Sequence, residues 1–266
     1  MIQTKLNSNG RLDVVIDAPP VNAFSTVLLQ KLAEILSNVS SETRVVVLRA
    51  EGRGFSAGGD IKEMDRLPSH VGIIRQIRDG LNACVAIEAC PVPVIVVVHG
   101  YVIGIGVLLV GVSDLIVAEQ GTRFILAEVD NGAVSGAVQA AALLPEKRVR
   151  AAMLTGATVF VEEMLSYGSV HSVVSGDRLV EEANAIAEII CAKVPAVVRA
   201  LKESLTRTFN RDLVSKYRAE ASYTYELHLT GDANKARSSW WTAENTGESQ
   251  LHIDAEVVER QINAGK

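Results

Sequence analysis

Short apolar runs and longer amphipathic stretches alternate along the first two thirds of the chain. The runs Leu12–Ile16, Val45–Leu48, Val94–Val98 and Leu115–Ala118 are nearly continuous and predict buried strands. The segment from Thr26 to Val39 instead repeats leucine and isoleucine at helical spacing, and Ser25 before it is a good helix cap. Strands followed by helices in this order predict an α/β fold.

Further helices are expected over Val71–Ala89, before two prolines, and in an alanine-rich stretch that ends at Leu144. After Leu179 the pattern is helical throughout, over Leu179–Ala192, Ala196–Phe209 and Asp212–Leu229. We therefore expect a core of residues 1–194 and a helical C-terminal region of residues 195–266, with the boundary near Pro195. The polar tail from Ala243 is expected to be a mobile arm or a partner-facing helix.

Composition narrows the class of protein. With 266 residues and 48% apolar side chains the chain can bury a large core, which excludes a disordered protein. A net charge of −5 argues against a nucleic-acid partner, although Arg49, Arg53, Lys62 and Arg66 could meet a phosphate locally. Three cysteines form neither a disulfide set nor a metal pattern, and no signal peptide precedes them, so we expect a cytoplasmic protein.

The longest apolar stretch runs from Val92 to Val112. It is interrupted by His99 and by glycines, among them Gly104 and Gly106. This pattern favours a strand, a turn and a buried helix over a membrane span, so no membrane partner is expected.

Two glycine-rich turns are the first candidates for chemistry. Ala57-Gly58-Gly59-Asp60 closely follows one buried strand, and Gly104-Ile105-Gly106 follows another and opens a helix. Glycine turns expose backbone N–H groups, which can converge on an oxygen that bears negative charge. Neither turn has phosphate-loop or dinucleotide spacing, and each alone is also compatible with an ordinary tight turn.

Glu128 is the most informative carboxylate because it ends the apolar run Phe124–Ala127. Partial burial there would raise its pKa and suit proton transfer, whereas a solvated loop position would not. Asp130 is a second candidate that we expect to face solvent, and His99 is expected to be structural. No histidine pair has zinc spacing and no nucleophile elbow is present, so no metal site is expected.

Several of these segments occur together in one known family. They are Pro20–Ala23, Arg49–Met64, Pro93–Gly106, Ser113–Ala118 and Phe124–Val129 with Gly132 behind it. In order and spacing they resemble the crotonase (enoyl-CoA hydratase/isomerase) superfamily, over about Leu12 to Leu229. The resemblance implies a spiral of ββα turns, a C-terminal helical region that builds homotrimers or hexamers, and an acyl-CoA substrate.

The resemblance also implies roles for individual residues. The amides of Gly59 and Ile105 would form the oxyanion hole for the thioester carbonyl, and Glu128 would be the acid/base. The stretch Ala57, Gly59, Asp60, Ile61 and Lys62, with Ile105, would bind the substrate and its coenzyme A, which enters as part of the substrate so that no separate cofactor is needed. Hydratases of the family hold water between two glutamates, and Leu108 stands where the first would be.

Within the superfamily, Arg49–Phe55, Leu109–Asp114, Tyr167–Val174 and Tyr217–Gly231 resemble an actinobacterial branch that opens steroid-derived rings as CoA thioesters. Three functions follow from the resemblance. The leading one is an enoyl-CoA hydratase-like lyase or isomerase that stabilises an enolate. Hydrolytic carbon–carbon cleavage of a cyclic β-diketone thioester is the alternative, and a non-catalytic acyl-CoA binding protein is the third.

Overall fold

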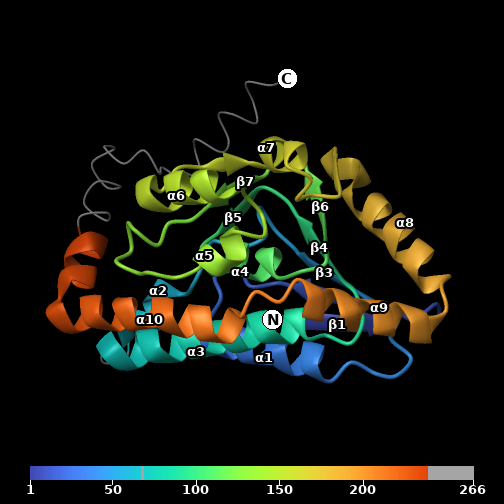
Figure 1. Ribbon diagram of the computed structural model, residues 1–266, viewed down its shortest axis with the longest axis horizontal. Coiled ribbons are helices and arrows are strands. Elements are labelled where there is room, and N and C mark those ends of the chain that lie inside the picture. The colour runs from blue at the N-terminus through green and yellow to red at the C-terminus, as the bar shows by residue number, and fades with distance from the viewer. Residues whose placement is uncertain (67–68, 239–266) are drawn as a thin grey trace.

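Parallel strands form the centre of the fold (Figure 1). The computed structural model describes residues 1–66 and 69–238. The larger sheet has the order β1 (Ile2–Leu6), β2 (Arg11–Ile16), β3 (Val45–Ala50), β4 (Val94–Val98), β6 (Leu115–Glu119) and β9 (Ser172–Val174). Within this sheet, as far as the structure describes the chain, only the β1–β2 pair is antiparallel, because a short turn joins these two strands, whereas crossovers join the others.

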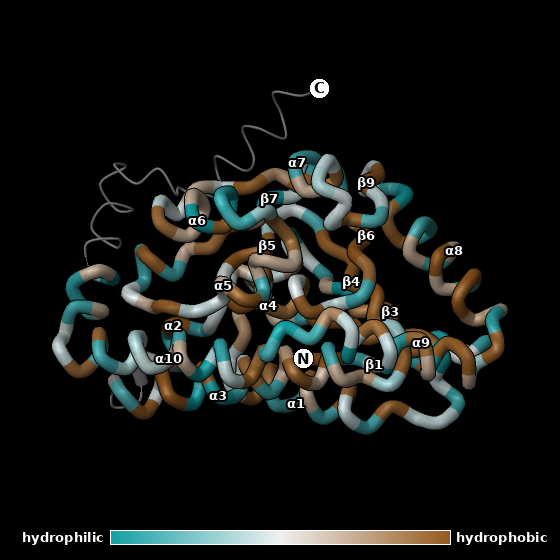
Figure 2. The backbone as a smooth tube through the Cα atoms, in the orientation of Figure 1, coloured by the Kyte–Doolittle hydropathy of each residue, from teal (hydrophilic) through white to brown (hydrophobic). Residues whose placement is uncertain are grey.

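Both faces of the central strands are covered, which explains their continuous apolar sequence. In β3, Val46 and Leu48 point into the main core, whereas Val45 and Val47 pack with helix α8 (Leu179–Cys191) on the opposite face. The brown backbone of these strands in Figure 2 shows the same apolar centre. The sequence therefore places two separate cores on one sheet.

Helices α1 (Thr26–Ser37) and α3 (Ser69–Glu88) pack on each other and contribute buried side chains to the main core. Ser25 caps α1, since its Oγ accepts a hydrogen bond of 3.2 Å from the Leu28 N–H. The other helices are the short α2 (Ile61–Arg66), α4 (Ile105–Gly111), α5 (Ala137–Ala140), α6 (Glu146–Thr155) and α7 (Val161–Ser166), a 3₁₀ turn at Gly176–Arg178, and α9 (Pro195–Thr208) and α10 (Leu213–Thr230).

A smaller sheet contains the strand that leads into the glycine turn Gly104–Gly106. It has the order β5 (Tyr101–Ile103), β7 (Arg123–Ile125) and β8 (Val159–Phe160). We expected residues 101–103 to be part of a turn, and this is wrong, because these three buried residues pair in parallel with β7. A bridge between Ser56 and Val102 also ties the first glycine turn to β5.

Most of the predicted elements agree with the structure. The strand at Val94–Val98 is confirmed at both ends, and the predicted helix over 71–89 corresponds to α3. The alanine-rich helix through Leu144 is wrong, because α5 ends at Ala140 and the chain continues in tight turns. Such short turns carry no helical periodicity that a sequence pattern could reveal.

The three C-terminal helices are confirmed to within one residue at each end. Helix α9 begins at Pro195, and the division of the chain into a core and a C-terminal region at this residue stays a prediction. Helix α10 packs directly on α3 and α5. The predicted tail from Ala243 lies outside the described residues. No helix within residues 1–66 and 69–238 is long and apolar enough to cross a membrane.

Candidate active site

The two glycine turns lie side by side. The Ile103 N–H donates a hydrogen bond of 2.9 Å to the Ser56 carbonyl, which holds the strand before the second turn against the first. Gly58 and Gly104 have φ angles of 96° and 50°, in the left-handed region that favours glycine. A β-carbon at Gly58 would lie 3.5 Å from the Ile103 carbonyl oxygen, so the backbones approach closely.

Two backbone N–H groups remain available where these turns meet. Ile105 begins α4, so its N–H has no carbonyl one turn earlier to bind. Neither this N–H nor that of Gly59 donates a hydrogen bond to any group in the described part of the chain. Both residues line one cavity of about 130 Å³. The family resemblance predicts that these two amides form an oxyanion hole, and two free N–H groups at one cavity are the kind of donor that such a hole needs.

Glu128 lies in the same cavity, just beyond β7. Its Oε2 atom is buried and has no hydrogen-bond partner among the described residues. The pKa of Glu128 is raised to about 7, mainly by burial; a hydrogen bond from its own backbone N–H opposes the shift, and the nearby carboxylates of Glu220 and Asp130 add to it. A carboxyl group with this pKa can both accept and release a proton near neutral pH.

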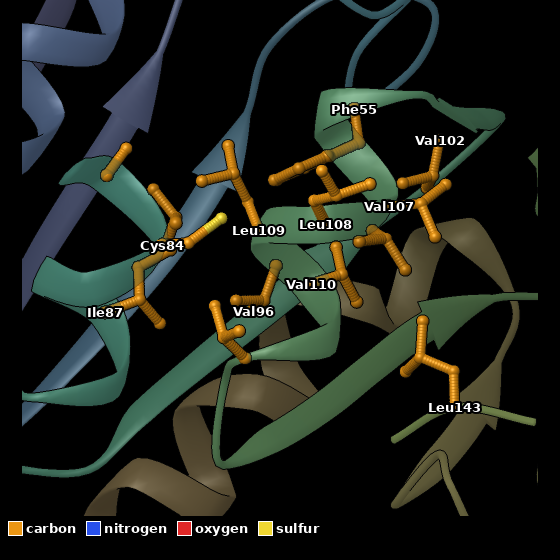
Figure 3. Packing of buried hydrophobic residues seen from close by; sticks show 14 of the residues in the cluster. Phe55, Cys84, Ile87, Val96, Val102, Val107, Leu108, Leu109, Val110 and Leu143 are labelled. Atoms are coloured by element: carbon orange, nitrogen blue, oxygen red, sulfur yellow. The ribbon is translucent and has the colours of Figure 1, made fainter. Parts of the chain in front are cut away.

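Leu108 occupies the wall of the cavity where a second carboxylate would be needed for hydration. It is 1% exposed, and a β-carbon at Gly136 would lie 2.7 Å from its Cδ1. Figure 3 shows Leu108 among apolar side chains of α4, with Phe55 nearby. Among the described residues that line the cavity, Glu128 is therefore the only carboxylate.

Five polar residues of the cavity were not among the predicted site residues. They are Gln76, Asn131, Ser135, Tyr217 and Arg237. Burial raises the pKa of the Tyr217 phenol well above its usual range, and a hydrogen bond with the Ser135 side chain opposes this shift. The sequence does carry one signal, because Gln76 interrupts the apolar face formed by Ile73, Ile77 and Leu81 on α3.

A second hollow, a groove of about 690 Å³, adjoins the cavity. The two share Ala57, Gly59 and Ile61, and the groove continues along Asp60, Lys62 and Lys31. The stretch predicted to bind coenzyme A therefore lines the groove, which shares Gly59 with the cavity.

The remaining candidates have other surroundings. Asp130 was expected to face solvent, which is wrong, since it is half-buried, its Oδ2 lacks a partner among the described residues and burial raises its pKa. His99, expected to be structural, does not line the cavity, and its Nε2 lies 2.9 Å from the Gly52 carbonyl oxygen. Arg49 pairs with Glu51, and the side chain of Arg66 lies outside what the structure describes.

Within the described ranges, no group of three or more histidine, cysteine, aspartate or glutamate side chains is placed to hold a metal ion.

The chain is similar to several known proteins. The chain is 41% identical to (7aS)-7a-methyl-1,5-dioxo-2,3,5,6,7,7a-hexahydro-1H-indene-carboxyl-CoA hydrolase of Mycobacterium tuberculosis, over 87% of this chain and 94% of that protein. It is 36% identical to the Rhodococcus jostii protein of the same name, over 94% and 97%. A crystal structure of an enoyl-CoA hydratase from Mycobacterium smegmatis matches with a TM-score of 0.75 and 28% identity, over 86% of this chain and 90% of that one.

The model of the family described as enoyl-CoA hydratase/isomerase matches residues 7–245. This match covers most of the chain, including both glycine turns and Glu128. The chain therefore belongs to the enoyl-CoA hydratase/isomerase family, the crotonase superfamily, and is an enzyme that acts on acyl-CoA thioesters.

Proposed function

We propose that this enzyme opens the ring of a cyclic β-diketone CoA thioester by hydrolysis of a carbon–carbon bond. One observation carries the proposal: Glu128 is the only carboxylate among the described residues of the cavity, and apolar Leu108 stands at the position of the first hydratase glutamate. The two relatives at 41% and 36% identity, both named as hydrolases of a dioxo-indene-carboxyl-CoA, support it.

The proposed mechanism uses three groups of the chain. The thioester carbonyl oxygen accepts hydrogen bonds from the Gly59 and Ile105 N–H groups. Glu128 takes a proton from water as the water oxygen bonds to the ring carbonyl. When the adjacent carbon–carbon bond breaks, its electron pair moves to the α carbon and into the thioester as an enolate, which the two amides stabilise. Glu128 then returns the proton to the α carbon.

Tyr217 is a candidate hydrogen-bond donor to the ring carbonyl oxygen of such a substrate. Because burial keeps its phenol protonated, its O–H can donate a hydrogen bond to the ring carbonyl as negative charge develops there. Its hydroxyl would lie 3.7 Å from a β-carbon at Gly80, and the Ile105 side chain would lie 3.0 Å from the same point. The phenol and the Ile105 side chain therefore belong to one wall of the cavity.

Enoyl-CoA isomerisation is the second candidate. A single base can move a proton from one carbon to another, so Glu128 alone would suffice, whereas hydration in this family uses a pair of glutamates. The match to the family described as enoyl-CoA hydratase/isomerase supports this second candidate. The two candidates differ in whether an oxygen from water enters the product.

The test follows from this difference. The enzyme is incubated in H₂¹⁸O with three probes: the dioxo-indene-carboxyl-CoA of the relatives, 2-oxocyclohexanecarboxyl-CoA and crotonyl-CoA. Mass spectrometry should find a ring-opened acid with one solvent oxygen from at least one cyclic probe, and little hydration of crotonyl-CoA. Rapid hydration or double-bond migration without ring opening would contradict the proposal.

We also propose that the chain assembles into a homotrimer or hexamer in the cytoplasm, without a separate cofactor. Helix α9 supports an assembly with further copies of the chain. Its residues Val197, Leu201 and Leu205 are 62%, 56% and 44% exposed, and at a spacing of four they form one apolar stripe that Phe209 extends. Apolar stripes of this kind are typical of helices that pack against another surface.

A further inference from the structure

Three hydrogen-bond acceptors in the cavity have no donor. Glu128 Oε2, Asn131 Oδ1 and Gln76 Oε1 are all buried without a hydrogen-bond partner among the described residues, and all three residues line the same cavity. Buried polar atoms in proteins are nearly always paired, with protein or with water. The molecule that pairs with these atoms during the reaction must therefore donate hydrogen bonds.

The Asn131 side chain is held in one orientation. Its Nδ2 donates a hydrogen bond of 2.9 Å to the Ala127 carbonyl, which leaves Oδ1 as the free acceptor. The Asn131 N–H closes the turn onto the Ala127 and Glu128 carbonyls, at 3.2 Å and 3.1 Å. The turn is therefore helical in form, and residues three apart on such a turn share a face, with their β-carbons about 5–6 Å apart.

Glu128 and Asn131 thus present two acceptors from one face of one turn. Gln76 belongs to a different part of the cavity, since its Nε2 binds the Phe24 carbonyl beside Gly59. A water molecule has two hydrogens to donate, one for each acceptor of the turn, and keeps a lone pair for attack. Leu108, at the position of the first hydratase glutamate, offers no such contact.

We propose that Asn131 and Glu128 together hold the attacking water. Asn131 then takes the water-binding role of the hydratase glutamate that Leu108 replaces in this chain. This inference rests on the proposed hydrolysis. Glu128 removes one proton from the water. The other hydrogen stays bonded to the water oxygen and donates a hydrogen bond to Asn131 Oδ1. This contact points a lone pair of the water oxygen at the carbon of the ring carbonyl. The second hydrogen ends in the new carboxylic acid, and the proton on Glu128 goes to the α carbon.

The test separates water positioning from enolate formation. In Asn131→Leu, hydrolysis of the cyclic probe should fall about 10²-fold in kcat, since misplacing a reactant has an effect of this order. Exchange of the α hydrogen of cyclohexanecarboxyl-CoA with D₂O needs only Glu128 and the two amides, so it should stay within about threefold. Asn131→Asp keeps an acceptor and should retain more hydrolysis, with a pH profile shifted upward by the added negative charge near Glu128.

Asn38→Leu is the matched control. The Asn38 Nδ2 also donates to a carbonyl four residues earlier, that of Glu34 at 2.8 Å, but the residue is exposed and does not line the cavity. This variant should keep full hydrolysis. Equal losses of hydrolysis and exchange in Asn131→Leu, or no loss of hydrolysis, would overturn the inference. A wild-type enzyme that exchanges the α hydrogen but opens no ring would overturn the proposed function and the inference with it.

Discussion

The side chain of Gln76 packs directly against the backbone of Gly59. A β-carbon added at Gly59 would lie 2.8 Å from Gln76 Nε2, and this nitrogen is itself held by a 2.9 Å hydrogen bond to the Phe24 carbonyl. One face of the proposed oxyanion hole is therefore fixed by a buried polar side chain from α3. Glycine at position 59 leaves room for that side chain.

Gly59→Ala should lower kcat/KM by roughly 10²-fold, because either Gln76 or the Gly59 amide must move and an oxyanion donor contributes about this much. The double variant Gly59→Ala with Gln76→Ala removes the clash and should recover part of the loss relative to Gly59→Ala alone. Steady-state kinetics on the cyclic probe measures both. Wild-type kinetics in Gly59→Ala would show that the approach of the two residues does not constrain the site.

Glu128 should make the fold less stable as pH rises. Its pKa is raised from 4.5 to about 7, so the folded protein holds this proton more tightly than the unfolded chain. Stability is therefore lost between about pH 4.5 and 7 and stays lower above that range. The quantity to compare is the free energy of unfolding of Glu128→Gln minus that of the wild type. This difference should be about 2–3 kcal/mol larger at pH 8 than at pH 4.

Urea unfolding of both proteins at the two pH values measures this difference. Glu226 is exposed, and Glu226→Gln is the matched control that should leave the pH dependence unchanged. Parallel stability curves for the wild type and Glu128→Gln would contradict the raised pKa.

Lys202 joins α9 to the central sheet through Asp114. Its Nζ lies 2.7 Å from Asp114 Oδ1, and Asp114 Oδ2 accepts a hydrogen bond of 2.8 Å from the Val94 N–H. The lysine side chain is 5% exposed, and Lys202→Met should cost about 2 kcal/mol, because Asp114 Oδ1 loses its charged donor while Oδ2 keeps the Val94 N–H. Lys31→Met breaks an exposed pair with Glu34 and should cost less than about 1 kcal/mol. Equal effects in denaturant unfolding would contradict this reading.

The apolar stripe of α9 predicts a change of oligomeric state. Leu201→Glu combined with Leu205→Glu places charges in the proposed contact and should convert the assembly to monomers, as measured by light scattering after size exclusion. Lys216→Glu, an exposed change on α10, is the control and should leave the assembly intact. A wild-type protein that is monomeric at micromolar concentration would exclude the proposed assembly.

Sequence patterns predicted the long helices and strands because burial determines which of their positions must be apolar. Strand β4 is buried on both faces and reads as five apolar residues, so its limits were visible. Strand β8 has two residues and β7 three, and runs this short carry no periodicity. Their pairing depends on contacts with distant parts of the chain.

The same difference applies to the site. The two glycine turns and Glu128 stood out because glycine turns and a carboxylate after an apolar run have local signatures, and the family resemblance then pointed to Gly59 and Ile105 within the turns. Tyr217 lies in a long helix where an aromatic residue is ordinary, and the packing of α10 on α3 brings its side chain to the cavity. Asn131 could have been noticed three residues after Glu128, yet its role depends on a turn that the sequence does not reveal.

Helix α10 carries both Tyr217 and Glu220, and Glu220 accepts a hydrogen bond of 2.7 Å from the Gly136 N–H beside Leu108. A fragment cut at the predicted boundary near Pro195 would keep the two amides and Glu128 but lose one wall of the cavity. In this enzyme the helical region that follows the core therefore completes the cavity that the core alone would leave open on one side.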